Sequence, residues 1–158
     1  MVEHLIDLPD ETATLRLGAA FAPGARNGLT LHLRGELGSG KTTLARGLIR
    51  GLGSQERVKS PTYTLLEHYT ISRLNLYHFD FYRFKDPSEW LSSGFQEHFG
   101  PDSLCLVEWP ERAGASLPPP DLEVALEIPA RGRRARLRAH TPAGETWLAS
   151  ALARCSAS

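Results

Sequence analysis

Apolar and polar residues alternate in four short stretches of the chain, which is the pattern of β-strands with one buried face. These stretches are residues 4–8, 29–34, 122–128 and 133–140. In the second stretch, Leu29, Leu31 and Leu33 alternate with polar side chains, so we expect one poorly covered face there. The last two stretches are separated only by residues 129–132, a spacing typical of a β-hairpin.

Other stretches predict further strands and the helices. Residues 103–109 are an almost continuous apolar run, which predicts a buried strand. We interpret residues 58–71 as a loop followed by a strand, and residues 74–83 as a strand joined to it by a hairpin. Boundary residues such as Asp86, Pro87 and Gly53 help to place the helices. The predicted helices are residues 9–22, 41–52, 86–99 and 143–154.

Strand–helix units around a glycine-rich stretch at residues 35–43, together with two hairpins, define the expected architecture. They predict an α/β fold with a mixed parallel and antiparallel sheet flanked by helices. A length of 158 residues favours a single domain over residues 1–158. We expect the last few residues to form a disordered tail.

Charge and composition narrow the function classes. The formal net charge is zero, which excludes a global basic field for nucleic acid and leaves only local patches. No apolar run approaches the ~20 residues of a membrane helix, and the acidic start of the sequence is unlike a signal peptide, so we expect a cytoplasmic protein with no membrane association. His78 and Asp80 share a strand face but lack a third ligand, so we interpret them as packing residues and not as a metal site.

The glycine-rich stretch carries the clearest chemistry. Gly35, Gly40, Lys41 and Thr42 fit the pattern G-x-x-x-x-G-K-S/T between a predicted strand and a predicted helix. Glycines let several backbone N–H groups point at one spot, and a helix N-terminus at that spot attracts phosphate. In such a P-loop the lysine reaches the β- and γ-phosphates and the hydroxyl binds Mg²⁺; the alternative is a glycine-rich turn with a surface lysine. The predicted nucleotide contacts are Gly38, Ser39, Gly40, Lys41, Thr42 and Thr43.

A P-loop also needs an acidic residue on a neighbouring strand to hold the metal or its water. Asp80 and Glu108 each follow an apolar stretch. The stretch before Glu108 is the more apolar, so we predict Glu108 on the metal side and Asp80 beside it, orienting the attacking water. The alternative for either acid is a surface position at a strand end. The sequence has no N-K-x-D-type stretch that reads guanine, which favours ATP over GTP.

Three further features have two interpretations each. Residues 60–65 lie where nucleotide switch segments often occur, so Thr62 or Thr64 is a candidate sensor of the γ-phosphate, and a plain turn is the alternative. Trp109 either stacks on a base or is an ordinary core aromatic. Alternate arginines within residues 131–138 form either a patch for tRNA or a partner, or a solvated hairpin face.

In these motifs the chain resembles the bacterial TsaE (YjeE) family of P-loop proteins. The resemblance is carried, in order, by GELGSGKTTLARGL, VKSPTYTLLEHY, YHFDFYR and CLVEWPER. It implies an ATPase that assists TsaD and TsaB in forming N6-threonylcarbamoyladenosine at position 37 of tRNA, without itself transferring the threonylcarbamoyl group. The implied site residues are Thr42 and Glu108 for Mg²⁺, Asp80 and Thr62 for hydrolysis, and Trp109, Glu11 and Glu111 around the nucleoside.

Two other functions fit a P-loop: a small-molecule or nucleoside kinase, and a nucleotide-dependent binding module with little turnover. A kinase usually has a lid with arginines, and residues 111–120 are the one candidate for a lid. Phosphate release without an acceptor distinguishes an ATPase from a kinase, and binding without release indicates the module. Arg83 is the one arginine that we expect close enough to act on the γ-phosphate in cis, so we expect slow hydrolysis until a partner supplies positive charge.

Overall fold

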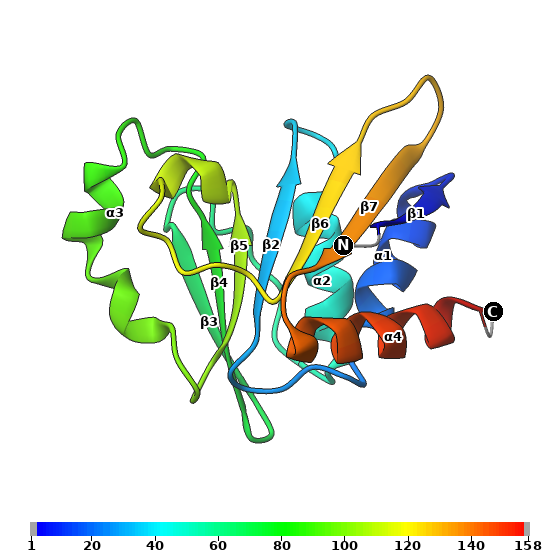
Figure 1. Ribbon diagram of the computed structural model, residues 1–158, viewed down its shortest axis with the longest axis horizontal. Helices are drawn as coiled ribbons and strands as arrows, with labels where there is room; N and C mark the ends of the chain where they lie inside the picture. The colour runs from blue at the N-terminus through cyan, green and yellow to red at the C-terminus, as the bar shows by residue number, and fades with distance from the viewer. Residues whose placement is uncertain (1–2, 157–158) are drawn as a thin grey trace.

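The strands of the chain lie side by side in one twisted sheet, with helices packed against it (Figure 1). The computed structural model describes residues 3–156, and within them the sheet has the strand order β1-β7-β6-β2-β5-β4-β3. The strands are β1 (Glu3–Leu8), β2 (Thr30–Gly35), β3 (Leu66–Ile71), β4 (Leu74–Asp80), β5 (Leu104–Glu108), β6 (Leu122–Glu127) and β7 (Arg133–Ala139). The helices are α1 (Glu11–Ala20), α2 (Lys41–Gly51), α3 (Ser88–Ser93) and α4 (Pro142–Ser156), with short 3₁₀ helices η1 (Phe95–His98) and η2 (Pro110–Ala113).

The middle of the sheet is parallel and both of its sides are antiparallel. β2 pairs in parallel with β5 on one side and with β6 on the other, and β5 pairs in parallel with β4. β3 is antiparallel to β4, β7 to β6, and β1 to β7. The prediction of an α/β fold with a mixed sheet and two hairpins is therefore confirmed. The parallel pairing also places the carboxyl ends of β2, β4 and β5 at one edge of the sheet, where α2 begins.

The expectation of a poorly covered face on β2 is wrong. β2 lies in the middle of the sheet, and η2 packs against it. Leu31 and Leu33 belong to the larger apolar core, while His32 is 4% exposed on the opposite face. Alternation along a strand is thus no proof of a solvated face, because a buried polar residue gives the same pattern.

Helices α1, α2 and α4 share the larger apolar core with the sheet. α1 and α2 approach closely through glycines: a Cβ added at Gly18 would lie 2.1 Å from the Leu44 carbonyl oxygen, and one at Gly47 would lie 2.2 Å from that of Leu15. Trp147 of α4 donates a hydrogen bond to the Phe21 carbonyl at 2.9 Å. These contacts fix α2 against α1, and α4 against the end of α1.

The helix predicted over residues 86–99 is two shorter helices. α3 ends at Ser93, Gly94 has a left-handed φ of 79°, and η1 follows. Glycine adopts this conformation without strain, so it ends the helix. The side chain of Gln96 then folds back and donates to the carbonyls of Trp90 and Leu91. This segment and β4–β5 share a second apolar cluster that is rich in aromatic side chains.

The C-terminal helix is longer than expected, because α4 continues to Ser156. Of the expected disordered tail, residues 157–158 lie outside the described residues. Within the described part of the chain, no helix is both long and apolar enough to cross a membrane.

Candidate nucleotide-binding site

The loop between β2 and α2 folds as a phosphate-binding loop should. Gly35, Gly38 and Gly40 all have positive φ angles, of 144°, 78° and 109°. A Cβ added at Gly35 would also lie 2.6 Å from the carbonyl oxygen of Leu126, so the loop needs glycine there for space as well as for conformation. The N-cap residue of α2 is Gly40, which has no side chain to cap the helix, so the backbone N–H groups of its first turn are available to an anion.

Lys41 is 5% exposed and its ammonium lies inside this loop. Its Nζ donates to the carbonyl oxygens of Gly35 at 2.5 Å and Glu36 at 2.9 Å. The same atom lies 4.4 Å from the ring centroid of Trp109. Burial lowers the pKa of Lys41, while the nearby carboxylates of Glu108 and Asp80 raise it. The lysine is thus a buried cation at the N-terminus of α2.

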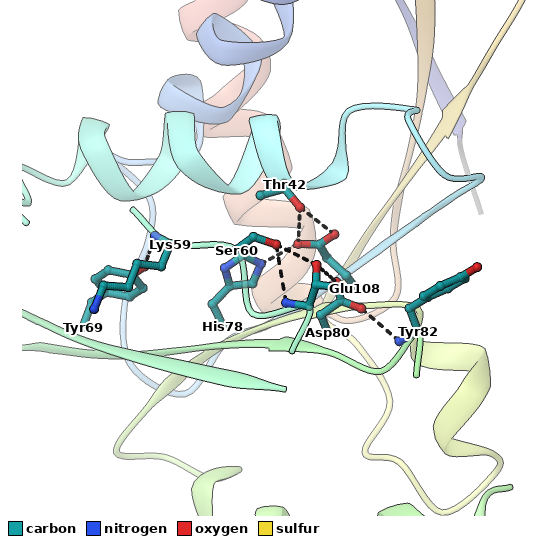
Figure 2. A network of polar contacts seen from close by, with 9 residues as sticks. Thr42, Lys59, Ser60, Tyr69, His78, Asp80, Tyr82 and Glu108 are labelled. Atoms are coloured by element: carbon teal, nitrogen blue, oxygen red, sulfur yellow. Dashed lines mark hydrogen bonds and ion pairs between the residues drawn. The ribbon is translucent and has the colours of Figure 1, made fainter. Parts of the chain in front are cut away.

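The two candidate acids lie side by side at the carboxyl ends of β4 and β5, where Asp80 pairs with Glu108 in register. The Thr42 hydroxyl at the start of α2 donates to Glu108, with distances of 3.1 Å to Oε1 and 3.0 Å to Oε2 (Figure 2). β5 is the direct neighbour of β2, as its apolar sequence predicted. Glu108 therefore lies next to the P-loop threonine, and Asp80 lies one strand further out.

Asp80 is buried and accepts a hydrogen bond from the Tyr82 backbone N–H at 2.9 Å. Burial raises the pKa of the Asp80 carboxyl, and the neighbouring Glu108 raises it further. A raised pKa makes the Asp80 carboxylate a better proton acceptor, which suits a group that takes a proton from a water molecule.

Of the two candidate threonines in residues 60–65, only Thr62 reaches the acids. Its hydroxyl lies 3.5 Å from Asp80 Oδ2 and 2.7 Å from the Ser60 hydroxyl. The Thr64 hydroxyl donates instead to Glu67 at 3.2 Å. Of the two threonines, Thr62 is therefore the one that contacts an acidic residue of the candidate site.

Two cavities flank the P-loop. The strand-side pocket, of about 230 Å³, is lined by Lys41, Thr42, Thr62, Asp80, Glu108 and Trp109, among others. The α1-side pocket, of about 250 Å³, is lined by Glu11, Gly38, Ser39, Gly40, Thr43 and Arg133, among others. Glu111 lines neither pocket; its carboxylate lies 3.7 Å from the Arg34 guanidinium.

Sequence reasoning missed two residues of this region. His78, interpreted as packing, is buried with its Nε2 2.7 Å from Glu108 Oε2. Its position two residues before Asp80 indicated that both side chains lie on the same face of the strand. Arg133, in the β6–β7 hairpin, donates to the Gly38 carbonyl at 3.1 Å. Because the two residues are 95 positions apart in the chain, the sequence did not reveal that contact.

The arginines at alternate positions of β7 are paired with carboxylates. Arg134 lies 3.1 Å from Asp7, and Arg136 lies 2.7 Å from Glu3 and 2.8 Å from Glu127. A further ion pair joins Arg138 to Glu3. These pairs are partly exposed. The structure therefore favours a solvated, internally neutralised hairpin face over a patch for phosphates.

The donors around Thr42 suit Mg²⁺, which prefers hydroxyl and carboxylate oxygens. Among residues 3–156, no group of three or more His, Cys, Asp or Glu side chains could hold a metal alone. Mg²⁺ commonly takes one or two protein ligands and completes its shell with water and substrate phosphates. The residues present therefore fit a metal that arrives with a nucleotide.

The glycine loop between a parallel strand and a helix, with its lysine and threonine facing acids at the neighbouring strand ends, defines a P-loop NTPase fold. The family model described as Threonylcarbamoyl adenosine biosynthesis protein TsaE matches residues 8–154. The chain belongs to the TsaE family.

Individual relatives agree with this assignment. The chain is 40% identical over 148 residues to the tRNA threonylcarbamoyladenosine biosynthesis protein TsaE of Haemophilus influenzae, covering 90% of this chain and 94% of that protein. It is 42% identical over 120 residues to the protein of that name from Bacillus subtilis, covering 75% and 73%. The crystal structure of Bacillus subtilis YdiB superposes with a TM-score of 0.81 at 27% identity, covering 96% and 95%.

Proposed function

We propose that this chain is a Mg²⁺-dependent ATPase that assists a TsaD- and TsaB-type assembly in forming N6-threonylcarbamoyladenosine at position 37 of tRNA. Membership of the TsaE family supports the pathway. The contact of the Thr42 hydroxyl with Glu108, next to the buried Lys41, supports the chemistry. That contact is the single observation on which the ATPase assignment depends, because a plain glycine turn needs neither group.

Phosphate binding, metal binding and activation of water are assigned to different groups of residues. Backbone N–H groups of residues 38–43 and the Lys41 ammonium bind the phosphates at the start of α2. Thr42 and Glu108 would hold Mg²⁺, which would supply positive charge to offset the charge of the nucleotide phosphates. Asp80, with Thr62 beside it, orients the attacking water and receives its proton.

The nucleoside half of ATP has less specific partners. Glu11 lines the α1-side pocket together with Gly38 and Thr43, which supports a contact with the nucleoside from that side of the loop. Trp109 lines the strand-side pocket beside Lys41, which supports a contact with the nucleotide from that side. Glu111 lies outside both pockets, so its proposed contact with the nucleoside requires it to leave Arg34.

Phosphate release from Mg²⁺-ATP, measured without any acceptor, tests the ATPase proposal. We expect release by the wild-type chain and its loss in Lys41→Ala, together with weaker binding of ATP, because the substitution removes the charge that faces the phosphates. Circular dichroism should show an unchanged fold in the variant. Release that requires an added acceptor would indicate a kinase, and tight binding without release would indicate a binding module; either result contradicts the proposal.

A further inference from the structure

His78 lies beside the proposed metal site, within the stretch YHFDFYR, but has none of the roles assigned above. It is fully buried on β4, and its Nε2 lies 2.7 Å from Oε2 of Glu108 (Figure 2). We propose that His78 is a positioning residue, which donates a hydrogen bond from Nε2 to Glu108 and so fixes the carboxylate for Mg²⁺. The inference rests on the proposed function, because it concerns the metal-binding acid of that site.

The direction of this hydrogen bond follows from its surroundings. An ionised carboxylate only accepts hydrogen bonds, so the imidazole must supply the proton from Nε2. Within residues 3–156, the other ring nitrogen, Nδ1, is buried without a hydrogen-bond partner. A bare Nδ1 without a donor is less costly than a buried N–H without an acceptor. The ring is therefore held as the tautomer with its proton on Nε2.

Glu108 needs such a partner because its contact with Thr42 does not fix which carboxylate oxygen faces the metal. Its two oxygens are nearly equidistant from the Thr42 hydroxyl, at 3.1 Å and 3.0 Å, so Thr42 alone does not choose between them. Asp80 is its pairing partner on β4 and contributes a second buried carboxyl group. By occupying Oε2, His78 leaves Oε1 as the oxygen free to face the metal or its water.

The alternative is that His78 only fills space between β4 and α2. His32 provides the matched control, since it is also a buried histidine on a central strand of the same sheet. It lies on the opposite face from Glu108, because it pairs with Val107 and successive side chains of a strand point to opposite faces. A role limited to packing predicts similar effects from replacing either histidine.

The experiment compares binding of a non-hydrolysable ATP analogue, AMP-PNP, in Mg²⁺ and in EDTA by calorimetry. Outer partners of metal ligands typically contribute about 10–100-fold to metal affinity. We expect His78→Leu to lose about that factor in Mg²⁺ and little in EDTA. His78→Gln should retain most of the affinity, because its amide nitrogen can donate from about the position of Nε2. His32→Leu should bind like the wild type in both conditions.

A measurement on the wild type keeps the proposal testable if a variant fails to fold. Nitrogen-15 NMR of labelled histidine reports which ring nitrogen carries the proton, and the His78→Gln spectrum identifies the His78 signal. A proton on Nε2 is expected, and a bare Nε2 would overturn the inference. Equal losses in His78→Leu and His78→Gln, or none, would also overturn it. If the wild type itself binds equally with and without Mg²⁺, the proposed function fails first.

Discussion

At the scale of single residues, Trp109 has a strained backbone conformation next to the candidate site. Its φ of 57° is left-handed, a conformation that costs a non-glycine residue about 1–2 kcal/mol. The ring is held by neighbours: Tyr82 lies 5.0 Å from it between centroids, and the Arg112 guanidinium lies 5.4 Å away. The strained backbone follows Glu108 directly and turns the indole over Lys41. The unusual conformation thus brings the indole next to Lys41, directly after the acid that we propose for the metal side.

Trp109 should therefore report nucleotide binding. Phosphates that draw the Lys41 ammonium away from Gly35 and Glu36 change the charge facing the indole, so we expect its fluorescence to change on addition of ADP. The response should disappear in Trp109→Phe and persist in Trp90→Phe, whose indole is buried in the aromatic cluster. A response that survives in Trp109→Phe would place the nucleotide away from this ring.

At the scale of elements, sequence patterns succeeded where the determining contacts are local. The P-loop was predictable because its glycines, lysine and threonine are contiguous, and the hairpins because their turns are short. Gly94 shows the limit within one element, since a single left-handed residue divides the predicted helix. His78 and Glu108 are 30 residues apart, and Arg133 and Gly38 are 95 apart. Such contacts depend on the order of the strands in the sheet and on where the β6–β7 hairpin lies relative to the P-loop. The periodicity of the sequence encodes neither.

The packing of α1 on α2 makes a prediction at this scale. In Gly47→Ala the new Cβ would lie 2.2 Å from the Leu15 carbonyl oxygen, so the helices must separate. Overpacking costs about 1–3 kcal/mol or more, whereas alanine gains only about 1 kcal/mol in helix propensity. We expect a net loss of about 2 kcal/mol in urea unfolding, because the obstructing atom is backbone. Arg50→Ala, on the exposed side of α2, should change stability little; equal stability of the two variants would contradict the assigned helix contact.

At the scale of the whole molecule, the described arginines lie outside the strand-side pocket that contains Asp80 and Glu108. Arg134, Arg136 and Arg138 of β7 are paired with Glu3, Asp7 and Glu127, whereas Arg133 contacts the Gly38 carbonyl from the α1 side of the P-loop. Arg83 lies 4.9 Å from the Tyr63 ring, and no arginine within residues 3–156 lines the strand-side pocket. Fast P-loop NTPases place an arginine against the γ-phosphate, in cis or from a partner, which accelerates turnover by about 10³–10⁵. Among the described residues, the strand-side pocket therefore contains Lys41 and the two acids but lacks this accelerating arginine.

The isolated chain should for that reason hydrolyse ATP slowly, and a partner should accelerate it. We expect steady-state phosphate release to rise by at least about tenfold when TsaD and TsaB are added, since a partner group supplies charge or orders residues 60–65. Lys41→Ala should remain inactive in the presence of both partners, which separates acceleration of this chain from hydrolysis by the partners themselves. Arg83→Ala should retain the slow rate of the isolated chain, because the guanidinium stacks on Tyr63 and lies outside the pocket. A fast isolated enzyme that is insensitive to partners and strongly impaired by Arg83→Ala would show instead that the chain moves its own arginine onto the phosphates.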